Sequence, residues 1–282
     1  MPKIIAVIGA GTMGTGIAQV AASAGCSVKL IDTREGALQG ALSVIASSLQ
    51  RLVKKAAMDE ATAQSVSNRI ERSADLLHAA NAEVVIEAIF ENEAAKLAIW
   101  TQLSSICAET ALFASNTSSI SITKMASAVK HPERFVGLHF FNPVPMMKLV
   151  EVVRGNRTSD ETARAAVELA TSFGKTAVEA RDFPGFVSNR VLMPMINEAI
   201  FAVYENVATP AAIDEIMKLG MAHPMGPLTL ADFIGLDICL AIMEVLQQGF
   251  GDSKYRPCPL LRQMVAAGKL GKKSGEGFYK YS

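Results

Sequence analysis

The N-terminal part of the chain joins an apolar run to a glycine-rich turn, and this feature limits the possible folds more than any other. The run KIIAVIG covers residues 3–9, continues as GAGTMG over 9–14, and leads into an alanine-rich helical pattern over 13–24. A continuous apolar run closed by glycine is typical of a parallel strand that is covered on both faces. A strand, a G-x-G-x-x-G turn and a helix in this order predict the first βαβ unit of a nucleotide-binding sheet.

Three glycines and the residues between them form the predicted binding turn. Gly9 permits the tight turn, Gly11 lets the backbone approach a pyrophosphate, and Gly14 lets the helix pack closely on the strand. The unpaired N–H groups at the N-terminus of the helix then face the phosphates. Thr12 and Met13 complete the turn, so we expect them to contact the cofactor as well.

A carboxylate closes the second apolar run, SVKLID, which covers 27–32. Asp32 at this place accepts hydrogen bonds from the adenosine ribose and repels a 2′-phosphate, which favours NAD over NADP. Arg34 lies two residues further along and weakens that preference. A purely structural glycine turn is the alternative, and the strand, helix and carboxylate around the glycines speak against it.

The alternation of strand and helix continues to about residue 184. Further apolar runs lie at 82–89, 111–115, 134–141, 148–153 and 175–180, and helical patterns between them include 92–107 and 160–173. A long helix over about 36–56 and a shorter one fill the connection after Asp32. This pattern predicts an α/β fold with a Rossmann-like, doubly wound and mostly parallel sheet.

After the segment RDFPGF the strand pattern ends. The remaining patterns are helical, with Pro and Gly between them, and cover 185–206, 210–219, 227–248 and 258–268. A chain of 282 residues is also longer than a usual single core. We therefore expect an NAD-binding domain over 1–184 and an all-helical domain over 185–282.

Charge and cysteine content exclude several classes of protein. Lys plus Arg and Asp plus Glu both total 27, which argues against a general nucleic-acid or membrane-surface role. The four cysteines are far apart and lack metal-ligand spacing, so we expect no metal and predict buried free thiols in a reducing cytoplasm. We see no export signal and no apolar run of about 20 residues.

A histidine and a carboxylate occupy two consecutive apolar runs. His139 lies near the end of RFVGLHFF, where the following Asn-Pro forces an irregular exit, and Glu151 interrupts KLVEVV. If the two strands are neighbours, Glu151 holds one ring nitrogen of His139 and leaves the other as an acceptor, as a general base requires. Each residue alone is better explained as a core histidine or an edge-facing glutamate. Their pairing favours the functional interpretation.

Polar residues also follow the run 111–115. Asn116, Thr117 and Ser118 come before a helix that we expect to begin near Ser119. Open α/β sheets bind ligands at the carboxyl ends of their strands. Ser and Thr at such a place are also good helix N-caps, and the two roles remain equally plausible.

One amide stands on an apolar helix face in the C-terminal part. Asn189 is the polar member of a helical stripe that otherwise consists of Phe186, Met193, Ile196 and Ile200. A buried amide needs a partner. Neighbouring backbone is the commoner partner, and a ligand is the alternative.

Two basic residues stand four apart in the long helix after Asp32. Arg51 and Lys55, with Lys54 between them, give this helix a basic end. A solvated surface is the simpler explanation. A contact of these two residues with a substrate phosphate is the more specific alternative.

Seven motifs together resemble the L-3-hydroxyacyl-CoA dehydrogenase family, and most closely its short-chain bacterial members, the 3-hydroxybutyryl-CoA dehydrogenases. The resemblance extends over essentially the whole chain. The motifs are VIGAGTMGTGIAQ, VIEAIFENEAAK, ASNTSSISIT, GLHFFNPVPMMKLVEVVRG, PGFVSNRVLMPMINEA, KLGMAHPMGPLTLADFIGLD and GKKSGEGFYKY. The resemblance implies a nucleotide-binding α/β domain, a helical domain through which two subunits dimerise, and NAD-dependent interconversion of L-3-hydroxyacyl-CoA and 3-ketoacyl-CoA.

The resemblance also implies roles for catalytic residues. His139 would take the proton of the C3 hydroxyl, and Glu151 would orient His139 and stabilise its charged form. Ser118 and Asn189 would hydrogen-bond the reacting oxygen or the thioester carbonyl. Asn142 would help to place the nicotinamide.

Further positions match cofactor and substrate contacts of the family. Those beside the cofactor are Glu91, Lys96, Asn116 and, from the C-terminal tail, Lys273. Arg51 and Lys55 would contact the adenosine phosphate of coenzyme A, and short-chain relatives often carry Lys in place of Arg51. Lys and Arg share their charge but differ in hydrogen-bond geometry.

Two alternatives belong to other functional classes. One is a non-enzymatic NAD-binding protein similar to the related lens crystallins, against which the joint presence of Ser118, His139, Glu151 and Asn189 argues. The other is a dehydrogenase of a small hydroxy acid without coenzyme A. Such a substrate would give Arg51 and Lys55 nothing to bind.

Overall fold

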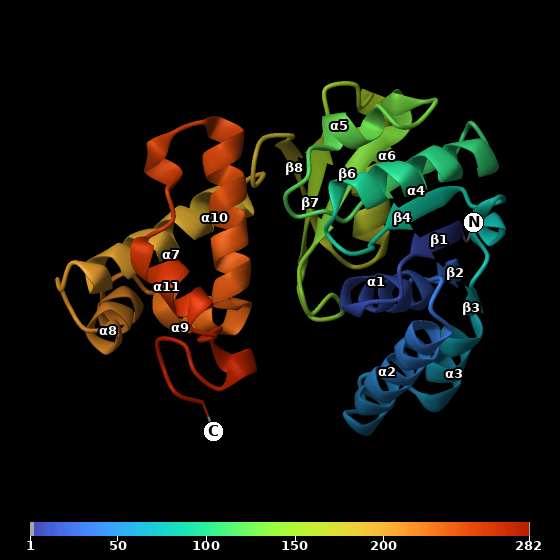
Figure 1. Cartoon of the computed structure of the whole chain (residues 1–282). Coiled ribbons are helices and arrows are strands. Elements are labelled where there is room, and N and C mark those ends of the chain that lie inside the picture. Colours follow the sequence, from blue (N-terminus) through green and yellow to red (C-terminus); the bar gives the residue numbers. More distant parts are fainter. Residues whose placement is uncertain (1–2, 282) are drawn as a thin grey trace. The chain divides into compact units, whose positions relative to one another are not determined.

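The computed structural model describes residues 3–281. The chain divides into two compact units between Asp182 and Phe183, beside the segment at which the strand pattern ends. The first unit is an α/β sheet with its helices, and the second consists of helices (Figure 1).

The sheet of the first unit has the strand order β3-β2-β1-β4-β5-β6-β7-β8. All neighbouring strands pair in parallel except β6 and β7, so the predicted mostly parallel sheet is confirmed. The strand order reverses direction beside β1, which is where such sheets bind ligands. The strands are β1 (Ile4–Ile8), β2 (Ser27–Ile31), β3 (Ile70–Ser73), β4 (Val84–Glu87), β5 (Leu112–Ser115), β6 (Phe135–Phe140), β7 (Leu149–Arg154) and β8 (Thr176–Arg181).

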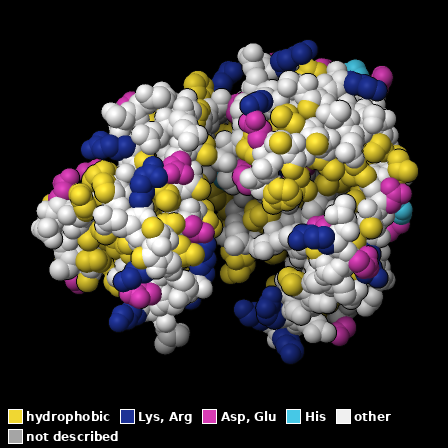
Figure 2. All heavy atoms as spheres, in the orientation of Figure 1, with side chains coloured by type: hydrophobic (Ala, Val, Ile, Leu, Met, Phe, Trp, Pro, Cys, Tyr) yellow, Lys and Arg dark blue, Asp and Glu magenta, His cyan; other side chains and the backbone are white. Residues whose placement is uncertain are grey.

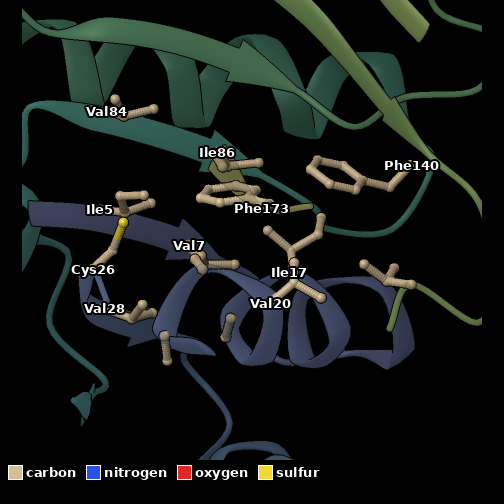
Figure 3. Close-up of a cluster of buried hydrophobic side chains, with 14 of the residues drawn as sticks. Ile5, Val7, Ile17, Val20, Cys26, Val28, Val84, Ile86, Phe140 and Phe173 are labelled. Atoms are coloured by element: carbon tan, nitrogen blue, oxygen red, sulfur yellow. The ribbon is translucent and has the colours of Figure 1, made fainter. Parts of the chain in front are cut away.

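Helices cover both faces of this sheet. They are α1 (Thr12–Ser23), α2 (Glu35–Lys54), α3 (Glu60–Asn68), α4 (Glu93–Ile106), α5 (Ile122–Ala126) and α6 (Asp160–Ser172), with short 3₁₀ helices at Leu76–Ala79 and Pro132–Arg134. Side chains from α1, α2 and α6 join one apolar core with alternate residues of the strands. Figure 3 shows part of this core, where Ile17 and Val20 of α1 lie near Val7 of β1 and Ile86 of β4.

The opposite face of the sheet carries α4 and α5. Trp100 of α4 packs on the rings of Phe113 and Phe135, and Ile122 of α5 lies so close to Gly137 that a Cβ there would clash with it. Successive strand residues point to opposite faces. The odd-numbered positions of β6 therefore face α4 and α5, whereas Leu138 and Phe140 join the α1 core.

Two details of the first unit differ from the sequence prediction. The short edge strand β3 was not expected, because only Ile70 of its four residues is buried and the apolar signal is correspondingly weak. The helix expected near Ser119 begins at Ile122, and its N-cap is Ser121, whose hydroxyl accepts from the Lys124 N–H. Ser118 therefore has no capping role there.

Over residues 183–281 the second unit contains five α-helices around its own core. They are α7 (Ser188–Tyr204), α8 (Pro210–Gly220), α9 (Pro227–Ile234), α10 (Leu236–Phe250) and α11 (Pro259–Ala266), with 3₁₀ helices at Ser253–Tyr255 and Lys272–Ser274. The single helix expected over 227–248 is wrong, because Gly235 adopts a φ of +104° and separates α9 from α10. Asn189, Met193, Ile196 and Ile200 of the predicted stripe lie on α7 and are buried, whereas Phe186, also buried, precedes the helix.

Buried carboxylates hold the C-terminal tail of the second unit. Asp232 accepts from the N–H groups of Phe278 and Tyr279 and from the Tyr281 hydroxyl. A Cβ at Gly277 would lie 2.0 Å from the Asp232 carboxylate, which explains the glycine in the tail motif. The tail is thus part of the folded unit.

Three of the four cysteines are buried, as the sequence led us to expect. Cys26, Cys239 and Cys258 are buried free thiols, but Cys107 is only half-buried because it follows the last residue of α4. Within residues 3–281 no group of three or more His, Cys, Asp or Glu side chains is arranged to hold a metal ion. In the same range, no helix has both the length and the apolar character that a membrane span requires.

Candidate active site

The glycine turn between β1 and α1 is shaped by close backbone contacts. Gly9 has a φ of +106°, and a Cβ there would lie 2.6 Å from the Ala88 carbonyl oxygen. A Cβ at Gly14 would lie 1.8 Å from the Gly9 carbonyl oxygen. By contrast, apart from Gly11 itself and its two chain neighbours, no residue has an atom within 4 Å of the position that a Cβ at Gly11 would occupy. Gly9 and Gly14 are therefore required by the fold, whereas Gly11 leaves open space in front of the turn.

The N-terminus of α1 has no side-chain cap. Gly11 is the N-cap residue, and it has no side chain that could accept from the first N–H groups of the helix. Gly11, Thr12 and Thr15, at the start of this helix, line a cavity of about 560 Å³. An uncapped helix N-terminus at a strand-order reversal suits an anionic ligand such as a diphosphate.

Asp32 stands beside this turn and is almost enclosed. Its carboxylate accepts from the Ala10 N–H at 2.9 Å and from the backbone N–H of Arg34 at 2.9 Å. Burial favours a raised pKa for Asp32, but hydrogen bonds from the Arg34 side chain and the two backbone groups hold the pKa below its usual value. The Arg34 guanidinium, with its side chain 73% exposed, pairs with Asp32 at 3.2 Å. Asp32 is thus a fixed anion at the end of β2.

His139 and Glu151 face each other across the antiparallel pair β6–β7. Glu151 Oε2 lies 2.7 Å from His139 Nδ1, and both side chains are buried. An ionised carboxylate only accepts hydrogen bonds, so it favours the ring tautomer with the proton on Nδ1. The contact expected from the sequence is present, and it leaves Nε2 as the acceptor nitrogen.

Ser118 completes this arrangement from the end of β5. Its Oγ lies 3.1 Å from His139 Nε2. Asn116 supports the same region, because its Oδ1 accepts from the Phe140 N–H at 2.9 Å and so connects the end of β5 to β6. The structure therefore brings together Ser118, His139 and Glu151, three of the four predicted catalytic residues.

Glu91 holds the turn that carries Ser118. Its Oε1 accepts from the Thr117 hydroxyl, from the N–H groups of Ser118 and Ser119, and from the Ser119 hydroxyl. Burial favours a raised pKa for Glu91, but the charge of Lys96 and these hydroxyl groups hold the pKa below its usual value. Glu91 is thus ionised and binds the 117–119 turn.

Lys96 is buried and pairs with two carboxylates of the protein. Its side chain is 1% exposed, and its ammonium contacts Glu87 at 2.6 Å and Glu91 at 3.3 Å. It is therefore engaged with two carboxylates of the protein. The predicted site did not include Glu87, although Glu87 interrupts the apolar run 82–89 of the sequence as Glu151 interrupts KLVEVV.

The cavity in front of α1 extends along α2. Its walls are the N-terminal part of α1, one face of α2 that ends at Arg51, and the segment 142–146, which begins with Asn142. Lys55 is the C-cap residue of α2 and is exposed. Figure 2 shows Lys and Arg side chains gathered at the end of the α2–α3 pair.

Two predicted site residues belong to the helical unit. Asn189 lies in the first turn of α7 and is buried. Lys273, in the C-terminal tail, contacts Asp237 at 2.6 Å.

Known proteins match both units of the chain. Residues 4–183 match the NAD binding domain of 3-hydroxyacyl-CoA dehydrogenase, and residues 185–281 match its C-terminal domain. The chain belongs to the 3-hydroxyacyl-CoA dehydrogenase family. Together the two matches extend over nearly the whole chain, as the sequence motifs indicated.

Individual relatives of the family are similar over their full length. The chain is 59% identical over 279 residues to a probable 3-hydroxybutyryl-CoA dehydrogenase of Bacillus subtilis, which covers 99% of this chain and 97% of the relative. A 3-hydroxybutyryl-CoA dehydrogenase of Bradyrhizobium diazoefficiens is 50% identical, and the match covers 99% of this chain and 95% of the relative. The crystal structure of (S)-3-hydroxybutyryl-CoA dehydrogenase from Ralstonia eutropha matches with a TM-score of 0.98 and 49% identity over all of both chains.

The residues of this chain fit the cofactor that the family binds. The uncapped α1 N-terminus and the open space at Gly11 suit the diphosphate of NAD, and the Asp32 carboxylate suits its adenosine ribose. The residues of the β1–α1 turn are therefore compatible with NAD at the position that the sequence motif predicts.

Proposed function

We propose that the protein is an NAD-dependent oxidoreductase that interconverts (S)-3-hydroxybutyryl-CoA and acetoacetyl-CoA. The full-length relatives named above support this substrate class. The observation that carries the proposal is the contact of Glu151 with His139 Nδ1, together with the Ser118 hydroxyl 3.1 Å from His139 Nε2. NAD, when bound, accepts a hydride from C3 of the hydroxyacyl substrate.

In the oxidation direction, His139 Nε2 takes the proton of the C3 hydroxyl. The ring then becomes an imidazolium, and the Glu151 carboxylate stabilises this charge through its hydrogen bond with Nδ1. Ser118, whose hydroxyl meets Nε2, and Asn189 are the donors that we propose for the reacting oxygen or the thioester carbonyl. In the reduction direction the same imidazolium returns the proton.

Asp32 and the basic end of α2 set the preferences for cofactor and substrate. Asp32 disfavours a 2′-phosphate, and Arg34 is paired with Asp32, so NAD is the proposed cofactor rather than NADP. Arg51 borders the cavity at the end of α2, and with Lys55 it offers positive charge to the adenosine phosphate of coenzyme A.

Initial rates with a series of substrates test this function. We expect acetoacetyl-CoA to be reduced with NADH, faster than longer 3-ketoacyl-CoAs, and much more slowly with NADPH. Activity on a small hydroxy acid but on no thioester would favour a dehydrogenase without coenzyme A. NAD binding without activity on any of these substrates would favour a non-enzymatic protein.

We also propose that the helical unit forms a homodimer. Ile216 and Leu219 stand three residues apart on α8 and are 59% and 79% exposed, and Val207 after α7 is 71% exposed. Large apolar side chains that are exposed together mark surfaces for protein contacts.

A further inference from the structure

We propose that Glu87 is a positioning residue for the reaction, because its buried carboxylate fixes the turn 117–119 and thereby the Ser118 hydroxyl that meets His139. This proposal rests on the function proposed above. It assigns a role to a residue whose hydrogen bonds go to Lys96, Ile89 and Ser115. The same carboxylate reaches the turn through two separate series of contacts.

Glu87 is the last residue of β4 and is completely buried. Its Oε1 accepts from the Lys96 ammonium at 2.6 Å and from the Ile89 N–H at 2.8 Å, and its Oε2 accepts from the Ser115 hydroxyl at 2.6 Å. Ser115 is the residue opposite Glu87 on the neighbouring strand β5. Both oxygens are therefore held, and the carboxylate has a fixed orientation.

The first series of contacts runs through Lys96 and Glu91. Lys96 lies between Glu87 at 2.6 Å and Glu91 at 3.3 Å. Glu91 in turn accepts from the backbone N–H groups of Ser118 at 3.0 Å and Ser119 at 3.2 Å. The buried Lys96 ammonium, held by Glu87, restricts where the Glu91 carboxylate can lie, because Glu91 loses electrostatic attraction when it moves away from the ammonium.

The second series of contacts runs through Ser115. Its Oγ donates to Glu87 and accepts from the Thr117 N–H at 3.3 Å. The Thr117 hydroxyl then accepts from the Ile120 N–H at 2.9 Å. Glu87 therefore acts on the turn at two places, at its beginning through Ser115 and across its middle through Glu91.

The alternation of the strands explains why these groups meet. Glu87 and Ser115 point to the sheet face that carries α4, as do His139 on β6 and Glu151 on β7, because the neighbours of all four residues in these strands belong to the opposite core. Lys96 comes from the first turns of α4 on this face. A carboxylate at Glu87 is thus placed to organise the donors around the base without direct contact to a substrate.

Activity measurements on variants of Glu87, Lys96 and Ser115 test the proposal, with the wild type as reference. Glu87→Gln and Lys96→Met should each lower kcat at saturating substrates by about 10- to 10²-fold, since small displacements of a positioned group have effects of this size. The kcat of the double variant should be no lower than the kcat of the less active single variant, because both substitutions break the same series of contacts. Ser115→Ala, which introduces no uncompensated charge, should lower kcat several-fold and serves if Glu87→Gln does not fold.

Asp214→Asn is the matched control. Asp214 is a buried carboxylate of the helical unit and accepts from the Leu228 N–H, the Thr229 N–H and hydroxyl, and the Tyr279 hydroxyl. This variant should lower Tm and leave kcat per folded molecule unchanged. If the double variant Glu87→Gln/Lys96→Met has wild-type kcat, Glu87 has only a structural role and the proposal is wrong.

The background Ser118→Ala tests whether the effect passes through Ser118. Without the hydroxyl, Glu87→Gln should change kcat by less than about twofold. An equal reduction in both backgrounds would contradict the proposed series of contacts. Hydrogen exchange gives a readout without activity, in which the Ser118 and Ser119 amides should exchange faster in Glu87→Gln and no faster in Asp214→Asn. A wild type without activity on any thioester would refute the proposed function, whereas normal activity of Glu87→Gln would refute only the role of Glu87.

Discussion

A single carboxylate determines what the His139 ring can do. Glu151 lies in register with His139 on the neighbouring antiparallel strand, so their side chains share one face of the sheet and meet at 2.7 Å. The buried pair restricts the ring to one orientation and stabilises it when it carries a positive charge. Removing one partner of such a pair typically destabilises a protein by about 3–5 kcal/mol.

His139→Gln should lower kcat by about 10²-fold or more, because glutamine cannot accept the substrate proton. The dissociation constant of NAD should change little, since the turn proposed for the diphosphate lies between β1 and α1. Steady-state rates and a fluorescence titration with NADH measure the two quantities. A variant with near-normal kcat would show that another group is the base.

The pKa of Asp32 predicts a pH dependence of stability. In the folded state the pKa lies below its usual value near 3.8. Ionised Asp32 therefore stabilises the fold above this value, and the stabilisation is lost as the pH falls through the folded-state pKa. Urea unfolding between pH 3 and pH 6 should show Asp32→Asn approaching wild-type stability as the pH falls. Arg34→Ala should weaken this trend, and a constant difference across the range would contradict it.

At the scale of elements, the β1–α1 turn contains one glycine that the fold requires, Gly14, and one that we propose is needed for cofactor binding, Gly11. Gly14 is in contact with the Gly9 backbone, so side chains have no room there, whereas Gly11 has ordinary backbone geometry with a φ of −75° and open space in front. The two glycines of one motif thus have different physical reasons to be glycine.

Gly14→Ala and Gly11→Ala should give opposite results. Gly14→Ala should lower the free energy of unfolding by about 1–3 kcal/mol or more, because its Cβ overlaps the Gly9 carbonyl. Gly11→Ala should change stability by less than about 1 kcal/mol but weaken NAD binding about tenfold or more, since the methyl group fills the space proposed for the diphosphate. Urea unfolding and NADH titration measure both variants. Unchanged NAD binding by Gly11→Ala would place the cofactor elsewhere.

At the scale of the whole molecule, the chain consists of two units that each bury a separate core. The exposed apolar residues of α8 have no explanation within the helical unit, where they contribute nothing to its core. A second copy of the chain would cover them in the proposed dimer.

Leu219→Glu should convert the dimer into a monomer, because the charge would be buried without a partner in the interface. Sedimentation equilibrium gives the mass of each variant in solution. Val44→Glu, an exposed apolar site on α2 of the first unit, is a comparison for the effect of the charge alone. A wild type that sediments as a monomer at micromolar concentration would contradict the dimer.

Much of this organisation follows from local sequence patterns. The apolar runs, the glycine turn and Asp32 predict the parallel sheet and its binding edge because each signal depends on neighbours along the chain. The pairing of His139 with Glu151 also follows, since consecutive strands with a short connection tend to be adjacent. Even so, the patterns miss β3, which buries one residue, and they join α9 to α10 because Gly235 does not interrupt the apolar periodicity.

Tertiary packing decided what the remaining polar groups do. Lys96 follows the expected cofactor motif, yet it is buried between Glu87 and Glu91, which requires α4 to pack on the face of β4 that Glu87 occupies. Ser118 meets His139 only because β5 and β6 are neighbours and the 117–119 turn is held in place. The sequence alone determined the mostly parallel sheet and the proposed base His139, since these depend on periodicity and on short connections. Only the tertiary structure determined the contacts around His139, because they depend on strand register and helix packing between distant residues.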